Sequence, residues 1–494
     1  MIPEARYIFK HALVQDAAYD SLLKSRRQEL HGKIARVLEA RFPEVKDTEP
    51  ELLAHHYAAA GQAGAAIAYW LKAAKRAASR STYRESLAHL DAGTAMLSGL
   101  PPGSERTRLE LQLQLQRSTA LLATQGMSAA ATGKAFAAAR ELCNQLGEDT
   151  KEIFQALYGI WAFHVASSQF QGSHEVAQEA LRRAQQINEP AVLVLAHRMM
   201  GTTLVPNGAL PEAAEHLEKV GLLYDPERDR ESALIYGSDI KAGAFAWLSQ
   251  AKYLLGQPDR ALAVASAALE HAESLKHFHS IAFARYWLPF VHLQRREPEQ
   301  ALEEGKLAMS LSEKHGFGMW YQLAKASCGV ALIELGQTSD GMVMIRESLT
   351  EGERMGIRFN SPYHLAALGI AAAKAQQWEE AANYLTEAAN QVEISGQRWY
   401  EGEIYRLRGE LLLAQGAEEA QAESSLVRSL EIVRAQHARS WELRTSTSLA
   451  KLWQSQGKRQ EAHDLLAPLY NWFIEGLDTK DLKEAKALLE ELAS

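Results

Sequence analysis

The feature that most constrains this chain is an internal repeat with a period of about 40 residues. Turn-plus-helix starts such as "GQPDRALAVA", "REPEQALEEG" and "QQWEEAANYL" recur and align on one small residue. That residue is Ser173, Ala213, Ala261, Ala301, Gly341, Ala381, Ala422 and Ala462, in steps of 40, 48, 40, 40, 40, 41 and 40 residues. A fixed period of this length indicates stacked structural units, each of which buries its apolar face only against its neighbours.

Each unit is predicted to be a hairpin of two helices. Further small or apolar residues follow the small position at offsets of four and seven, which lie on one face of an α-helix. A glycine precedes the small position by twelve or thirteen residues in several units, at Gly201, Gly329, Gly369 and Gly409. We therefore expect the two helices of a unit to cross closely, with this glycine against the small residue of the second helix.

This spacing of glycine, alanine, apolar and small residues resembles the tetratricopeptide repeat (TPR). The usual TPR period is 34 residues, so longer helices or loops are expected here. The resemblance implies an all-α fold, a TPR-like α-solenoid whose helical hairpins form a right-handed superhelix with the first helices on the concave side. In agreement with an all-α fold, strand signals are almost absent after residue 10.

Both ends of the chain resemble one family of large bacterial signalling proteins. The opening "FKHALVQDAAYDSLLKSRRQELHGKIARVLE" looks like the last part of a winged-helix segment, and the closing "LAKLWQSQGKRQEAHDLLAPLYNWFIEGLDTKDLKEAKALLEEL" is similar to that family's tail. In those proteins a class III adenylate/guanylate cyclase domain precedes an AAA/STAND-type ATPase and a long TPR-like region. The resemblance implies that the opening is a winged-helix remnant and that cyclase and ATPase activity belong to an absent N-terminal portion.

Four segments are expected from these patterns. They are the C-terminal part of a winged-helix-like segment (1–45), irregular TPR-like helices (46–150), the regular repeats (151–475) and a capping helix (476–494). The capping helix carries an apolar stripe that includes Leu482 and Leu492, and we expect its charged residues, such as Lys483, Glu484 and Glu490, to face outward.

Composition narrows the function classes. A net charge of -8 over 494 residues offers no cation surplus for a nucleic-acid backbone, so no nucleic-acid partner is expected. The two cysteines, Cys143 and Cys328, are far apart, which favours neither a disulfide framework nor a zinc site. The sequence has no run of eighteen apolar residues and no signal-peptide pattern near its start, so no membrane association is expected and the cytoplasm is the predicted location.

Two motifs imitate chemical sites. The stretch "GMSAAATGKAF" suggests a phosphate-binding loop, but its glycines are seven apart rather than five and Ala135 stands where such a loop needs a hydroxyl. The histidines His271, His277 and His279 suggest a metal cluster, but no carboxylate or thiol is placed to complete it. We therefore expect no catalytic residue, no metal and no cofactor.

The functional prediction is a non-catalytic protein–protein interaction scaffold, acting as the TPR sensor arm of a cyclase/ATPase signalling protein. Mapping the repeat places eight side chains in a concave groove that suits a peptide or protein ligand: Arg198, Gln250, Tyr253, Tyr286, Phe290, Arg406, Glu410 and Lys451. Most aromatic residues of the first helices are expected to be core, because solenoid units must bury aromatic side chains between neighbours. The alternative function is sensing of a small-molecule inducer, as in ATPase-linked regulators with helical repeats.

The opening segment supplies a second candidate interface. His11, Arg26, Arg27 and His31 have a structural reading, as residues that pack on the missing part of a winged helix. Their functional reading is a phosphate sensor for nucleotide bound in a neighbouring ATPase module. They would then form an interface on the ATPase side, and that module would be a second partner beside the groove ligand.

Overall fold

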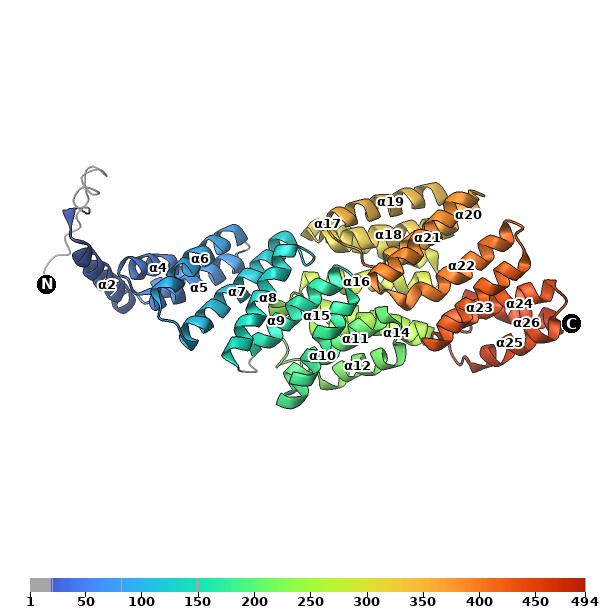
Figure 1. Ribbon diagram of the computed structural model, residues 1–494, viewed down its shortest axis with the longest axis horizontal. Coiled ribbons are helices and arrows are strands. Elements are labelled where there is room, and N and C mark those ends of the chain that lie inside the picture. Colours follow the sequence, from blue (N-terminus) through green and yellow to red (C-terminus); the bar gives the residue numbers. More distant parts are fainter. Residues whose placement is uncertain (1–18, 20, 81, 148–150, 494) are drawn as a thin grey trace. The chain divides into compact units, whose positions relative to one another are not determined.

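The computed structural model describes residues 19, 21–80, 82–147 and 151–493, and every regular element in these residues is helical. The expected all-α solenoid is therefore confirmed. The chain forms two compact units divided between Ala156 and Leu157 (Figure 1). None of the described helices has the length and apolar character needed to span a bilayer.

The first unit is a series of short helical hairpins. Its helices are α2 (Lys24–Arg41), α3 (Val45–Thr48), α4 (Pro50–Ala59), α5 (Ala63–Ser79), α6 (Tyr83–Met96), α7 (Ser104–Gln125) and α8 (Ala130–Leu146), with a 3-10 turn at Leu97–Gly99. The helix α9 (Lys151–Ala166) runs through the division between the units. Trp70 on α5 is buried with Leu53 of α4 and Ala35 of α2, which joins these three helices in one core.

The second unit contains the regular repeats. Its earlier helices are α10 (Phe170–Ile187), α11 (Pro190–Asn207), α12 (Leu210–Leu223), α13 (Ser232–Tyr236), α14 (Ile240–Leu254), α15 (Pro258–Ser274), α16 (Phe278–Arg295) and α17 (Pro298–His315). Its later elements are α18 (Gly318–Glu334), α19 (Thr338–Arg354), α20 (Ser361–Lys374), α21 (Trp378–Ser395), the 3-10 helix η2 (Arg398–Tyr400), α22 (Glu401–Ala414), α23 (Glu419–Ala435), α24 (Arg439–Ser455), α25 (Arg459–Trp472) and α26 (Lys480–Ala493).

The predicted close crossing within each hairpin is confirmed. The small position lies on the second helix of its hairpin and is buried in every unit. A Cβ placed on Gly329 of α18 would lie 2.7 Å from the carbonyl oxygen of Gly341 on α19, and one placed on Gly409 would lie 3.1 Å from that of Ala422. Such contacts leave no room for a side chain, so these glycines set the distance between the paired helices.

The turn inside each regular hairpin uses the left-handed backbone conformation. In order along the chain, its residues with positive φ are Ser168, Gly208, Gly256, Arg296, Gly336, Gln376, Gly416 and Gly457. Five of these eight are glycine, the residue that adopts this conformation without a steric cost. The three exceptions therefore carry a side chain at the expense of local strain.

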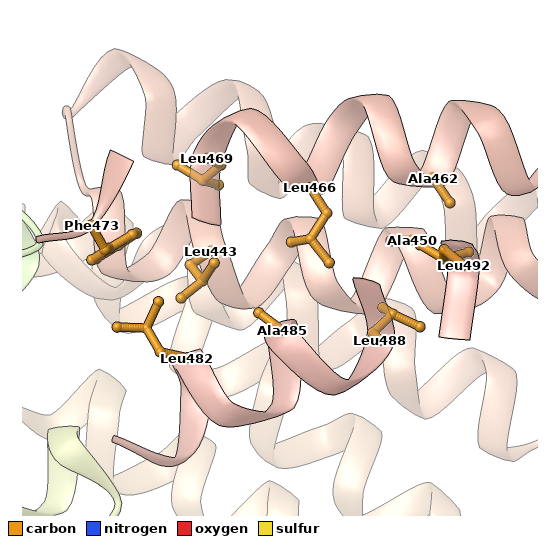
Figure 2. Packing of buried hydrophobic residues seen from close by; sticks show 10 residues of the cluster. All are labelled: Leu443, Ala450, Ala462, Leu466, Leu469, Phe473, Leu482, Ala485, Leu488 and Leu492. Atoms are coloured by element: carbon orange, nitrogen blue, oxygen red, sulfur yellow. The ribbon is translucent and has the colours of Figure 1, made fainter. Parts of the chain in front are cut away.

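The last described helix packs its apolar stripe against the hairpin before it. Leu482, Ala485, Leu488 and Leu492 of α26 are buried against α24 and α25, where Leu466 and other apolar side chains meet them (Figure 2). Glu484, expected on the charged outer face, keeps 38% of its side chain exposed but forms an ion pair with Arg296 at 3.0 Å and lines the pocket described below. The same helix therefore both caps the apolar core and presents charged groups to the inner side of the unit.

Candidate ligand pocket

The first helices of the later repeats surround a pocket of about 470 Å³ within the second unit. Its walls come from the end of α16, from α18, α20, α22 and α24, and from the start of α26. A volume of this size falls within the range of about 300–1,000 Å³ that is typical of sites for small ligands.

The helical spacing of the lining residues explains how the pocket is built. On α20 they are Tyr363, Ala367, Ile370 and Lys374, which follow one another at intervals of four, three and four and so share one helix face. The corresponding face of α22 begins at Glu403, and that of α24 at Trp441. Because the repeat places the same face of each first helix inward, the pocket is a direct product of the 40-residue period.

A network of charged side chains, here called the charge ladder, begins on α22. Arg406 donates to both carboxylate oxygens of Glu403, at 2.8 and 3.0 Å, and to Glu410 at 2.6 Å. The Ser448 hydroxyl of α24 donates to the same Glu410 oxygen at 2.7 Å. Burial opposes ionisation of Glu410, but Arg406, Ser448 and Lys451 outweigh it and lower its pKa.

The charge ladder continues from α24 to α26 and back to α16. Arg444 donates to Asp481 at 2.6 Å and has a second carboxylate, Glu403, at 3.7 Å. Arg296 contacts the other oxygen of Asp481 at 3.3 Å, in addition to Glu484. Burial alone would lower the pKa of Arg444, but Asp481, together with Tyr253 and Glu403, raises it well above its usual value. Arg444 therefore stays charged, and both arginines bind α26 to the pocket wall.

Arg296 occupies one of the left-handed turn positions, with φ of 62°. Most of the equivalent turns use glycine there, so the arginine side chain is present in spite of a conformational cost of about 1–2 kcal/mol. Its guanidinium meets Asp481 and Glu484, which lie 185 and 188 residues further along the chain. Strain of this kind is common where a side chain serves a specific contact.

Contacts that bring α24 onto α14 and α16 complete the pocket; we call them the closure. Arg444 donates to the carbonyl oxygen of Gln294 at 2.6 Å and to the Tyr253 hydroxyl at 3.1 Å. The Ser440 hydroxyl donates to the carbonyl oxygen of Tyr253, and Tyr253 itself donates to that of Gln294. The contacts of α24 within the closure therefore join residues that are 150 to 191 positions apart in the sequence, and α24 lies beside α14 (Figure 1).

Several polar groups of the pocket have no partner among the described residues. Lys451 and Lys480 form neither a hydrogen bond nor an ion pair there, and Lys374 donates only to the carbonyl oxygen of Ile333, at 3.2 Å. The Glu334 carboxylate likewise has no ion pair in the described part of the chain. Loss of hydration raises its pKa, although the positive charges of Arg444, Arg296, Lys374 and Lys480 act in the opposite direction. The side-chain amide of Gln294, which is 2% exposed, also lacks a hydrogen-bond partner within the described residues.

Three of the eight predicted groove residues line this pocket, namely Arg406, Glu410 and Lys451. Tyr253 lies directly behind the wall, where it contacts Arg444. The sequence reasoning missed Arg444, which joins three elements of the pocket. The repeat offered a signal for it, because Arg444 stands about one period after Glu403.

The prediction that Tyr286 and Phe290 are groove anchors is wrong. Both side chains have 0% exposure. The Tyr286 hydroxyl accepts a hydrogen bond from Asn360 at 2.9 Å, and Phe290 packs edge-on against Trp399, with ring centroids 5.7 Å apart. The alternative reading of these aromatic residues as core between units is therefore the one that fits, because the segments before α20 and α22 cover them.

Arg198 and Gln250 are also buried rather than exposed to a groove. Arg198 donates to the Ser238 hydroxyl at 2.8 Å, and its guanidinium carbon lies 5.5 Å from the centre of the Tyr158 ring. Gln250 is 1% exposed. Neither residue is among those lining the pocket, so both are corrected from ligand contacts to parts of the core.

The N-terminal candidates belong to the first unit, and His11 lies outside the described residues. Arg26 forms an exposed ion pair with Glu29 at 2.6 Å, and Arg27 lies over the ring of Tyr19. The Nδ1 atom of His31 is 2.8 Å from that of His56. These contacts are local to the first unit, and the interface with an ATPase module stays a prediction.

The phosphate-loop-like stretch and the three histidines that suggested a metal cluster lie in or beside ordinary helices. The phosphate-loop-like stretch leads into α8, whose Ala135 and Phe136 are buried. His271 contacts Asp239 at 3.1 Å and His277 caps α16, while burial lowers the pKa of His279 to about 4. Within the described residues, no group of three or more His, Cys, Asp or Glu side chains is arranged to hold a metal ion.

Comparison with known proteins supports the fold. No family model matches the chain. An uncharacterized protein of Rhizobium meliloti (strain 1021) is 21% identical over 447 residues, which are 90% of this chain but only 43% of that protein, so the chain spans less than half of this relative. The crystal structure of a Rap protein complexed with competence and sporulation factor superimposes with a TM-score of 0.54, at 13% identity, over 78% of this chain and 99% of that one.

The fold is that of a TPR-like helical-repeat protein. A STAND protein (signal transduction ATPase with numerous domains) with a tetratricopeptide repeat sensor from Pyrococcus horikoshii is a weaker match, with a TM-score of 0.41 and 16% identity over 78% of this chain and 54% of that one. These identities are too low to transfer a function. The superposition on the Rap protein agrees with the helical hairpins described above.

Proposed function

We propose that this chain is a non-catalytic regulatory protein whose second unit binds a short peptide or peptide-like ligand in the pocket on its concave side. The observation that carries the proposal is the pocket itself, where the inner faces of successive repeats and the first turn of α26 converge. Aromatic and aliphatic side chains alternate there with charged groups, as in sites that anchor a ligand by apolar contacts and orient it by polar ones.

The size of the pocket limits the ligand to a short segment. One turn of an α-helix with its side chains, taken as a cylinder 10 Å wide and 5.4 Å long, occupies roughly 420 Å³. The pocket of about 470 Å³ has room for about one such turn. The ligand is thus a few residues of peptide or a molecule of similar size, rather than a whole amphipathic helix.

The experiment is capture of peptides from a random library by the full chain. Ile370→Trp adds bulk to a residue that lines the pocket, whereas Ala382→Trp adds the same bulk on the exposed side of α21. We expect the wild type and Ala382→Trp to retain the same peptides and Ile370→Trp to lose them. Equal retention by all three proteins would refute the pocket as the binding site.

A second candidate is a receptor for a small-molecule inducer, and the limited pocket volume favours it. A metabolite panel would test it by thermal unfolding, because a ligand at 100 times its dissociation constant stabilises the folded state by about 2.7 kcal/mol. A shift that Ile370→Trp abolishes, together with no captured peptide, would favour this candidate.

A more specific form of the proposal is that the chain is the sensor arm of a cyclase/ATPase signalling protein and that its opening segment is a winged-helix remnant. The support for this form is the resemblance of the opening and closing sequences to that family. The test is binding of the full chain to a purified ATPase–cyclase portion from such a protein, with and without Arg26→Ala/Arg27→Ala. We expect binding that the double variant weakens, and no binding would refute this form.

A further inference from the structure

The pocket carries unsatisfied positive charge. Its cations are Arg296, Lys374, Arg406, Arg444, Lys451 and Lys480, and its acids are Glu334, Glu403, Glu410, Asp481 and Glu484. Six cations and five acids leave a formal charge of +1 in a chain whose net charge is -8. A positive pocket in an acidic protein attracts anions locally while the rest of the surface repels them.

The arginines and the lysines of the pocket differ in whether they form ion pairs. All three arginines are engaged in the charge ladder with four of the five acids. The lysines Lys374, Lys451 and Lys480 form no ion pair among the described residues, and they surround the remaining acid, Glu334, and Glu410. The positive charge that is open to a ligand therefore comes from three flexible ammonium groups.

A second observation points to a ligand at the same place. Both polar atoms of the Gln294 side chain are buried without a hydrogen-bond partner in the described residues, although Gln294 belongs to the pocket wall. A buried amide without partners costs about 1–3 kcal/mol. A carboxylate group in the pocket can accept from this amide and from a lysine at once.

We propose that the pocket recognises a small carboxylate-bearing ligand with an apolar body, through Lys374, Lys451, Lys480 and the Gln294 amide. This inference rests on the proposed function, because it names the chemistry of the ligand for the same pocket. Two sources share that chemistry: a short peptide with a free C-terminal or side-chain carboxylate, and a dicarboxylic acid with an aliphatic middle.

The pocket walls favour carboxylate over phosphate. Phosphate is best held by arginine forks, and the three arginines here are already bound to acids. The apolar part of the ligand has Val330, Ile370, Leu407 and Trp441 to pack against.

The experiment is isothermal titration of the full chain at low salt with four probes. They are the tripeptide Ala-Leu-Asp, its counterpart Ala-Leu-Asn with an amidated C-terminus, which lacks both carboxylates, the dicarboxylate pimelate, and inorganic phosphate. The triple variant Lys374→Met/Lys451→Met/Lys480→Met tests the site. Lys314→Met/Lys483→Met/Lys486→Met removes the same charge from exposed positions outside the pocket and is the matched control.

We expect Ala-Leu-Asp or pimelate to bind the wild type and the control variant with dissociation constants that agree within twofold. The dissociation constant for the pocket variant should be at least 100-fold higher, because each charge-assisted hydrogen bond contributes about tenfold or more to the affinity. Which of the two binds identifies the source. Any of four results would overturn the inference. They are equal binding of the amidated tripeptide, tighter binding of phosphate, unchanged binding to the pocket variant, and no binding of any probe at 10 mM.

The proposed function can fail separately. If library peptides bind in the pocket and are lost in Ile370→Trp but show no acidic preference, the proposed function holds and the carboxylate inference falls. If pimelate alone binds, its binding is lost in the triple lysine variant and no peptide is retained, the carboxylate inference holds and the proposal of a peptide ligand is rejected.

Discussion

The hairpin crossings make a sharp stability prediction, because the same substitution should destabilise the protein at one glycine and leave its stability almost unchanged at an equivalent one. In Gly329→Ala the new Cβ would lie 2.7 Å from the Gly341 carbonyl oxygen and 2.7 Å from Cγ1 of Ile345. Ordinary contact begins at 3.4 Å, so α18 and α19 must separate by about 0.7 Å (3.4 minus 2.7). In Gly369→Ala the nearest atom is Cγ of Leu385 at 3.1 Å, and the backbone of Ala381 is already at 3.4 Å.

The expected energies follow from two opposing terms. Alanine in place of glycine inside a helix gains about 1 kcal/mol in helix propensity. Overpacking costs about 1–3 kcal/mol, and the upper value applies where backbone must move. We therefore expect Gly329→Ala to lower the free energy of unfolding by about 2 kcal/mol and Gly369→Ala to change it by about zero, since the Leu385 side chain can adjust.

The two cysteines provide an assay for where the loss occurs. Cys328, next to Gly329, is 1% exposed and its pKa is raised to about 11 by burial, while Cys143 lies buried in the first unit. Alkylation followed by mass spectrometry should be about 30-fold faster at Cys328 in Gly329→Ala, the factor equivalent to 2 kcal/mol, and unchanged at Cys143. Equal acceleration at both cysteines, or a Gly329→Ala protein as stable as Gly369→Ala, would refute the reasoning.

Three further substitutions test the charged and buried groups. Arg296→Gly removes the strain of the left-handed backbone but also the contacts to α26, so we expect less hydrogen-exchange protection in α26. Gln376→Gly, at the equivalent turn of another repeat, is the control. It should raise the free energy of unfolding by about 0.5–1 kcal/mol and leave the hydrogen-exchange protection of α26 unchanged. Burial lowers the pKa of His364 to about 3, so the unfolded chain alone binds this proton below pH 6.5 and stability falls as pH falls. His364→Gln should remove about 2 kcal/mol of the loss between pH 7 and pH 5 in urea titrations, and an unchanged slope would contradict this assignment.

The sequence predicted the hairpins well because their geometry is local. The period and the glycine-to-alanine spacing place Gly329 opposite Gly341 without knowledge of any distant contact. The same mapping located Arg406, Glu410 and Lys451 on the inner side, since the inward face of a helix follows from its spacing.

The rest of the pocket depends on contacts that no local pattern encodes. Tyr286 has an inward register, but Asn360 covers it from the segment before α20. Glu484 fits an outward face of an isolated helix, yet Arg296 meets it from 188 residues away. Curvature accumulated over several repeats decides such contacts, and small rotations in each repeat are not readable from the spacing of residues.

The closure has a consequence for how this molecule assembles. A repeat array normally tolerates the loss of a terminal repeat, because each unit depends only on its neighbours. Here Arg444 must reach Gln294, and a flexible loop of that length would lose about 4–5 kcal/mol of entropy on joining its ends. Stiff intervening repeats remove most of that loss, so the contact depends on α17 to α23 being folded. The proposed ligand, held between these walls, would therefore report that every repeat between them has folded.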